Sequence, residues 1–318
     1  MLSMTMVIAD QNRADPAGNA LRDWPGLQLR ATQLLRSPSS TDFDGRFRAL
    51  HGTLARLCEQ SPDATLLALI YLSAQETRMY SATHALLVSC VCMVVAREML
   101  HWPPSQVHQV GQAGLSMNIA MTELQDQLAQ QLQPLTPEQI NGVANHAARS
   151  EDLLRQLGVT DRLWLEAVRC HHQRAPGGLA KKSSAQQTAR LVQRADIFGA
   201  RLAPRAARWP MPVTVAMQAC YYDEARQVDE AGAAIVKTLG VYPPGALVRL
   251  ASNEVGIVIR RGATATAPRV AVLIDHYGLP IHEPIFRETG MLTWRITGVV
   301  AFKDVRTPWS LNQLLDLA

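Results

Sequence analysis

The sequence predicts a mainly α-helical protein that ends in a small β-rich domain. Apolar residues recur at helical spacing almost throughout the segment from 27 to about 234. After the turn-forming YPPG at 242–245, short runs rich in β-branched residues replace that spacing. A chain of 318 residues is also longer than one hydrophobic core usually serves, which favours two modules.

Two predicted helices begin with recognisable capping chemistry. Ser61-Pro62-Asp63 offers an N-cap, a proline at the first helical position and an acid in the first turn. The stretch TPEQ, which starts at Thr136, has the threonine and glutamine of a capping box. These signals place helices after residues 61 and 136.

Short strands are expected in the C-terminal part, at 246–250, 254–261, 269–275 and 292–300. We therefore expect three regions, which are a leader with an N-terminal helical segment (1–60), a helical domain (61–239) and a small β-rich domain (240–318). Packing against the helices and binding of a partner both remain open as roles of the β-rich domain.

Composition and charge indicate a cytoplasmic protein without a nucleic-acid duplex or a membrane as partner. The net charge is +4 and the basic residues are scattered, which suits a small anionic ligand better than a duplex. The five cysteines follow no secretory signal, so reduced thiols are expected. The most apolar run, 86–96, is too short to span a bilayer and predicts a buried helix.

Several ionisable residues lie on the apolar faces of predicted helices. His84, His146, His171 and Asp196 each continue an apolar stripe and so point towards the core. His172 follows His171 directly, and consecutive side chains about 100° apart converge only on a site at a helix end. Such a cluster suits iron, manganese or zinc, whereas a single histidine on an apolar face is more often a hydrogen-bonded core residue.

The order of these motifs resembles the HD-GYP family, the cyclic di-GMP phosphodiesterase branch of the HD phosphohydrolase superfamily. The family has a first His, LLHDIGK, LTxEE leading to a His, HHERxDGxGYP, and a helix with an Asp. This chain has His84, GLSMNIAM, LTPEQ leading to His146, HHQR from His171, and the helix of Asp196. The resemblance covers about 62–203, extends loosely to YPPGALVRLASNEVG, and implies an HD-type helical bundle in bacterial signalling.

The same match shows which family residues are replaced. The His-Asp pair falls on Met117 and Asn118, and the lysine that meets phosphate falls on Met121. The glutamate of HHE is Gln173, and PGGLA at 176–180 replaces the GYP signature. No intact catalytic set is therefore expected.

Met117 also begins a run of apolar residues at helical spacing that continues through Met121 and Leu124 to Leu128. This spacing is typical of an ordinary buried helical stripe. The position of the family's catalytic histidine is therefore expected to be part of the core.

In the family, one metal is held by the first His, the His-Asp pair and the last Asp, and the other by the Asp of the pair and three later histidines. Carried over, the first site keeps His84 and Asp196, and the second keeps His146, His171 and His172. Because a neutral Asn118 cannot bridge two cations as a carboxylate does, no two-metal centre is expected. The hypothesis is weak binding of a single iron, manganese or zinc ion at the three histidines, or none; two tightly held ions per chain would contradict it.

Two functions are open at this stage. The first is a catalytically degenerate signalling protein that acts in cyclic di-GMP related regulation by binding a protein partner or a nucleotide. The second is a divergent phosphodiesterase with a single metal at the remaining histidines, which hydrolysis lost in His171→Ala would favour. Arg174 is a candidate for binding the dinucleotide, and a diguanylate cyclase domain or a second copy of the chain are candidate partners.

Overall fold

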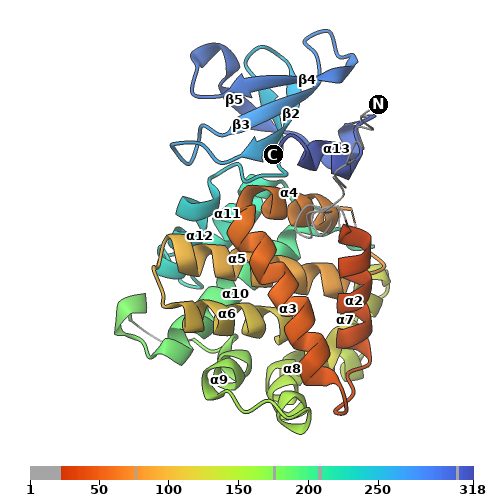
Figure 1. Cartoon of the computed structure of the whole chain (residues 1–318), viewed down its shortest axis with the longest axis vertical. Helices are drawn as coiled ribbons and strands as arrows, with labels where there is room; N and C mark the ends of the chain where they lie inside the picture. The colour runs from red at the N-terminus through yellow and green to blue at the C-terminus, as the bar shows by residue number, and fades with distance from the viewer. Residues whose placement is uncertain (1–22, 76, 175–176, 207–209, 306–307) are drawn as a thin grey trace, which may run out of the picture.

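The computed structural model has a helical body with a small β-rich part above it (Figure 1). It describes residues 23–75, 77–174, 177–206, 210–305 and 308–318, and the leader predicted for residues 1 to about 20 lies outside them. The elements of the body are α2 (Trp24–Arg36), α3 (Phe43–Gln60), α4 (Pro62–Ser73), α5 (Tyr80–Glu98), α6 (Pro104–Ser116), η1 (Ile119–Met121), α7 (Thr122–Gln130), α8 (Pro137–Gln156), α9 (Arg162–Cys170), η2 (Leu179–Lys181), α10 (Ser184–Leu202), α11 (Val213–Tyr221) and α12 (Glu230–Leu239). Those of the β-rich part are β1 (Leu247–Leu250), β2 (Val255–Arg260), β3 (Arg269–Ile274), β4 (Pro280–Glu288), η3 (Leu292–Trp294), β5 (Ile296–Val299), η4 (Phe302–Asp304) and α13 (Leu311–Leu315). The predicted fold class, mainly helical with a small β-rich end, is confirmed.

The helical body is built around α5. Its sequence, YSATHALLVSCVCMVVARE, has no continuous polar face, and a helix that is apolar on all sides is stable when buried on all sides. The helices α2, α3, α4, α6, α7, α10 and α12 pack around it, so that every residue from Tyr80 to Ala96 is buried. Within the described part of the chain, α5 alone is long and apolar enough to cross a membrane, but its burial is that of a core helix.

Capping side chains determine where the helices near the candidate residues begin. Thr136 Oγ1 accepts a hydrogen bond from the backbone N–H of Gln139, and the Gln139 side chain accepts one from the N–H of Thr136. The predicted capping box of α8 is therefore confirmed. Ser183 and Gln186 form an equivalent box at the start of α10, which was not predicted.

The five strands form one antiparallel sheet in the order β4-β3-β2-β1-β5. Strands were expected where β1, β2, β3 and β5 lie, whereas β4 was missed because Pro280 and Pro284 interrupt its strand pattern. Both prolines are tolerated because β4 is an edge strand. The charged side chain of Glu283 on this edge is also typical of strands that avoid further pairing.

One arginine, Arg261, directly follows β2 and links the β-rich part to the helical body by hydrogen bonds. The backbone N–H and the guanidinium of Arg261 both bind the carboxylate of Asp63 in α4. Its NH1 also donates to Glu98 Oε2 in α5 at 2.6 Å and to the carbonyl of Thr238 in α12 at 3.3 Å. Burial alone would raise the pKa of Glu98, but hydrogen bonds from Arg261 and Arg97 lower it. One side chain thereby connects three helices to the sheet.

Replacing Arg261 by alanine should lower the free energy of unfolding by about 2 kcal/mol, because several partly buried charged hydrogen bonds are lost together. Arg249→Ala is the control, since Arg249 bonds Asn253 within its own exposed turn, and its effect should stay below about 0.5 kcal/mol. Urea unfolding followed by circular dichroism measures both variants. Equal losses in the two would contradict a fastening role for Arg261.

Candidate metal site

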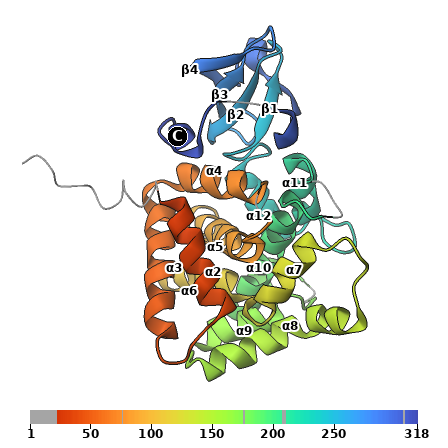
Figure 2. The same ribbon diagram turned by 90° about the vertical axis from the view of Figure 1, so that its right-hand side faces the viewer.

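The helices α8 and α9 lie side by side (Figure 2). Three imidazoles converge where α8 meets the end of α9. His146 lies on α8, and His171 and His172 directly follow the last residue of α9. His146 Nε2 lies 3.1 Å from His171 Nε2 and 3.2 Å from His172 Nε2. One ring nitrogen from each of the three lies within 4.8 Å of the others. We call these residues the histidine trio; His146 and His171 are buried, and His172 is exposed.

Backbone hydrogen bonds fix the protonation of two rings in the trio. His146 Nδ1 lies 2.6 Å from the carbonyl of Val143, and His171 Nδ1 lies 2.6 Å from the carbonyl of Val168. Because a carbonyl oxygen only accepts, each Nδ1 carries the hydrogen and donates it. Burial, with a contribution from His172, lowers the pKa of His171 to about 3, and burial also lowers the pKa of His146. Both rings are therefore neutral near pH 7, and each Nε2 presents a lone pair.

The trio fits a metal ion. Two lone pairs 3.1 Å apart make no hydrogen bond with each other, but they can share a cation. Zinc takes imidazole nitrogens at about 2.0–2.1 Å in tetrahedral sites, which places neighbouring ligand nitrogens about 3.3 Å apart. The spacings of 3.1 and 3.2 Å are close to this value. Backbone carbonyls that accept from Nδ1 are also usual partners of metal-bound histidines.

His84 and Asp196 form a separate pair that links α5 to α10. His84 Nε2 donates to Asp196 Oδ1 at 2.7 Å. Burial alone would raise the pKa of Asp196, but this hydrogen bond and electrostatic interactions with the imidazoles of His84, His171 and His172 lower it to about 2. Asp196 is thus ionised and lies in the electrostatic field of the trio. The five residues predicted as metal ligands therefore lie in two groups, a trio and a pair.

Met117 and Asn118 occupy the turn between α6 and η1. Met117 is 1% exposed, as expected for a core residue, and Asn118 Oδ1 is buried without a hydrogen-bond partner among the described residues. The prediction of a helical stripe from Met117 to Leu128 is wrong, because α6 ends at Ser116 and α7 begins only at Thr122. The turn contains no proline or glycine, so the helical spacing of apolar residues continued across it without a visible break.

Two residues near the site were not singled out from the sequence. A Cβ at Gly199 of α10 would lie 3.0 Å from His84 Nδ1, so this glycine permits the close approach of α10 to α5. Glu151 of α8 is buried although it is charged. The sequence signal for Gly199 was a glycine inside a helical pattern, and the signal for Glu151 was an acid three residues before the apolar Leu154.

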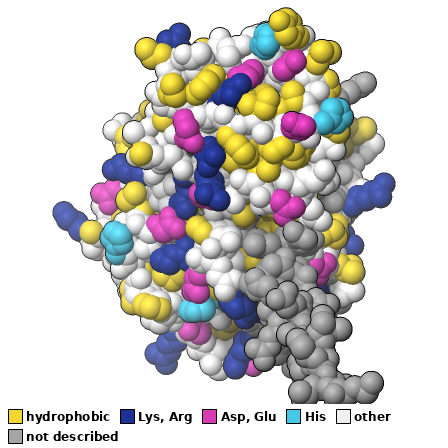
Figure 3. Space-filling model, turned by 45° about the horizontal axis from the view of Figure 1, so that its top comes forward, with side chains coloured by type: hydrophobic (Ala, Val, Ile, Leu, Met, Phe, Trp, Pro, Cys, Tyr) yellow, Lys and Arg dark blue, Asp and Glu magenta, His cyan; other side chains and the backbone are white. Residues whose placement is uncertain are grey.

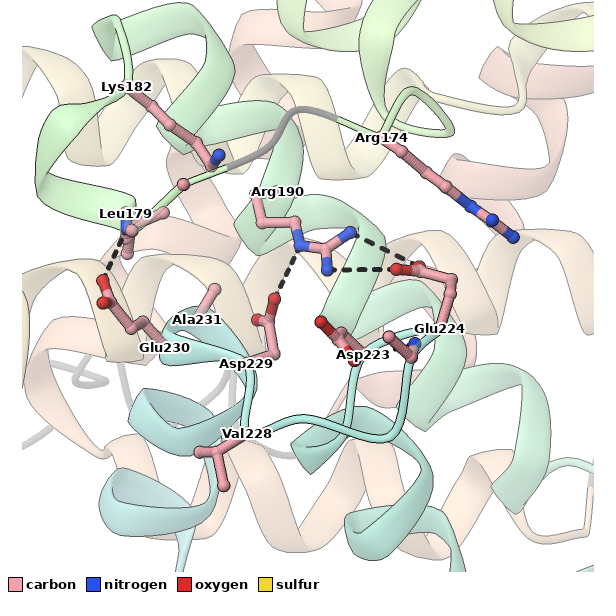
Figure 4. Close-up of a pocket in the computed structure, with 13 residues that line it drawn as sticks. Arg174, Leu179, Lys182, Arg190, Asp223, Glu224, Val228, Asp229, Glu230 and Ala231 are labelled. Atoms are coloured by element: carbon pink, nitrogen blue, oxygen red, sulfur yellow. Dashed lines mark hydrogen bonds and ion pairs between the residues drawn. The ribbon is translucent and has the colours of Figure 1, made fainter.

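Arg174 follows the trio by two residues and lines an open cleft of about 540 Å³ (Figure 4). The other charged side chains of the cleft are Lys182, Arg190, Asp223, Glu224, Asp229 and Glu230. Arg190 donates to Asp229 Oδ2 at 2.7 Å and to Glu224 Oε2 at 3.3 Å. Four carboxylates against three cations give a phosphate group no net positive field, so binding of a dinucleotide by Arg174 stays a prediction. The neighbouring Ala175 and Pro176 lie outside the described residues.

Comparison with known proteins finds a match to the cyclic di-GMP phosphodiesterase PA4108 of Pseudomonas aeruginosa, with 26% identity over 215 residues. The chain is a distant homologue of a cyclic di-GMP phosphodiesterase. The match covers 66% of this chain and 51% of the relative, so the chain spans about half the length of that protein. No family model and no solved structure matches the chain. The homology supports the resemblance that the motifs indicated.

The trio is expected to bind Zn²⁺ or Co²⁺ added to metal-free protein, with about one ion per chain, and His171→Ala should abolish that binding because one of three ligands is lost. His276→Ala, which removes an exposed histidine of the β-rich part, should leave the stoichiometry unchanged. Elemental analysis after gel filtration measures the bound ion. Equal metal content in all three proteins would show that the trio is not the site.

Proposed function

We propose that this protein acts in cyclic di-GMP related signalling, keeps one metal site, and has lost two-metal hydrolysis. The observation that carries the proposal is the direct hydrogen bond between His84 and Asp196. In the family that the sequence resembles, these two positions hold the first metal together with the His-Asp pair. Here they bind each other, and the positions of that pair are occupied by Met117 and Asn118. Among the described residues, the trio is then the place proposed to hold an ion.

Charge balance argues against a second ion. Two divalent cations about 3.5–4 Å apart need an anionic ligand between them to offset their repulsion. Asn118 is neutral, and Met117 offers at most a thioether, which is a weak ligand for iron or manganese. An ion at the first position would also have to displace His84 from the Asp196 carboxylate, which it contacts at 2.7 Å.

An ion held by the trio would supply a Lewis acid with an open position, able to polarise a phosphate oxygen or a water molecule. The residues of the chain do the rest. Val143 and Val168 orient the rings of His146 and His171 through their carbonyls, so that both Nε2 atoms face one point. His172 is exposed and gives this point its access to solvent.

Regulation by binding agrees with the replaced phosphate contacts. In the resembling family a lysine meets the phosphate, and the corresponding Met121 carries no charge. The cleft of Arg174 adds no net positive field. Strong binding of a doubly charged dinucleotide therefore depends on the ion of the trio, and tight binding of a protein partner does not.

The β-rich part offers a surface for a protein partner. Hydrophobic side chains gather on the face shown in Figure 3, and apolar surface of this kind is typical of protein interaction sites. The large hydrophobic side chains that are exposed in the described residues of the β-rich part are those of Tyr277, Leu279, Ile285, Met291 and Leu292. A diguanylate cyclase domain is the partner class that the family resemblance implies, and a second copy of the chain is the alternative.

A divergent enzyme is the second candidate, and the completeness of the trio favours it. Three imidazoles with one solvent-facing member are the ligand set of catalytic zinc sites that keep a position open for water. In this alternative a single ion would activate water for hydrolysis of cyclic di-GMP. The two functions differ in turnover, which separates them in one assay.

Cyclic di-GMP incubated with the Mn²⁺-loaded protein should remain intact, whereas the double variant Met117→His, Asn118→Asp should bind about two ions per chain and hydrolyse it. The matched control is Met117→Leu, Asn118→Ala, which changes the same positions without adding ligands. Chromatography of the products and elemental analysis give both readouts. Turnover by the unaltered chain that disappears in His171→Ala would replace the proposal with the single-metal enzyme.

A further inference from the structure

A buried carboxylate connects the two segments that carry the trio. Glu151 lies on α8, five residues after His146, and its side chain is 5% exposed. Its Oε2 accepts a hydrogen bond from Arg169 NH1 at 2.9 Å, and Arg169 is two residues before His171. Its Oε1 accepts from Arg155 Nε at 2.5 Å, and Arg155 lies on α8 itself. Of these two bonds, the one to Arg169 joins α8 to the end of α9.

Within the described residues, the other side-chain contacts at hydrogen-bond distance between α8 and the stretch 162–172 are those among the histidines themselves. Arg169 also interacts electrostatically with Asp152 of α8. The ion pair of Arg169 with Glu151 is therefore the polar contact that joins these packed segments independently of the imidazoles and of any ion.

The carboxylate remains charged in this position. Burial alone would raise the pKa of Glu151, but hydrogen bonds from Arg155 and Arg169 lower it. A charge-assisted hydrogen bond to a buried carboxylate is stronger and more directional than a neutral one. The orientation of α9 relative to α8 at the level of the trio is thereby restricted.

We propose that Arg169 and Glu151 are positioning residues that set the spacing between His146 and the adjacent pair His171-His172, and so raise the affinity of the trio for a divalent metal ion. This inference rests on the proposed metal site. A site whose ligands are already held at binding distance loses less entropy when the ion binds. Partners outside the ligand shell commonly change metal affinity by about 10–100-fold.

The direction in which the affinity for a cation changes distinguishes a positioning role of Arg169 from an effect of its charge. Removing a positive side chain near a cation site raises its affinity for the cation, since the repulsion is lost. Arg169 and Arg155 bind the same carboxylate and are similarly exposed, at 56% and 58%. A loss of affinity in the Arg169 variant, without one in the Arg155 variant, is therefore expected from the lost connection between α8 and α9 and not from the change of charge.

The test is titration of the full metal-free chain with Co²⁺, followed by its visible absorption, which also reports coordination geometry. Arg169→Ala should weaken Co²⁺ binding about 10-fold or more and alter the absorption bands. Arg155→Ala should bind Co²⁺ as tightly as the unaltered chain or slightly more tightly. Arg169→Lys, which keeps the charge and a donor, should recover most of the affinity.

Thermal unfolding of the metal-free variants shows whether each is folded at the titration temperature. Folded Arg169→Ala with unchanged Co²⁺ affinity would overturn the positioning role while leaving the metal site intact. Equal weakening in Arg169→Ala and Arg155→Ala would overturn it as well. Absence of Co²⁺ binding by the unaltered chain would instead overturn the metal site itself, and the positioning role with it.

Discussion

Burial of α5 is the constraint on which the other helices depend. An apolar helix of this length has to be surrounded, and its few polar side chains have to find partners within the surrounding helices. Thr83 accepts a hydrogen bond from a glutamine of α2, Ser89 donates to a carbonyl of α6, and His84 donates to the aspartate of α10. Each polar residue of α5 thus specifies the position of a different neighbour.

The candidate site follows from this arrangement. Because His84 Nε2 bonds Asp196, this pair ties α5 to α10 and serves the packing of the core. In the trio, two rings are oriented by carbonyls of their own helices, and the third residue is exposed. The pair therefore contributes to packing of the core, and the trio remains available to a ligand. Asn118 is a neutral amide, which cannot hold the two groups around a shared ion as a carboxylate would.

The identity of the candidate residues could be predicted from the sequence, because the order of the motifs and the helical spacing both point to the same five side chains. Their division into a trio and a pair could not, since the bond between His84 and Asp196 joins residues far apart in the chain and depends on the approach that Gly199 permits. The role of Glu151 also depends on a partner in the next helix.

Two features of the fold, a turn and a strand, could not be predicted because their own residues lack the usual sequence signals. The turn at Met117 and Asn118 lacks the residues that usually mark a turn, so the spacing of apolar residues predicted one continuous helix. The strand β4 contains two prolines, which are admissible at the edge of a sheet but remove the strand signal from the sequence. The edge position that makes the prolines of β4 acceptable is set by the pairing of the strands and is not visible in the sequence of β4 itself.

The contacts of Arg261 have a consequence for any shortened form of the protein. A fragment that ends at Leu239 would leave the carboxylates of Asp63 and Glu98 without this cation, and would expose the surface of α4 that packs against β2 and α13. An uncovered apolar helix face promotes association, and the freed acids would repel each other at the ends of α4 and α5. The helical part isolated in this way would differ in solubility and in oligomeric state from the same residues in the full chain.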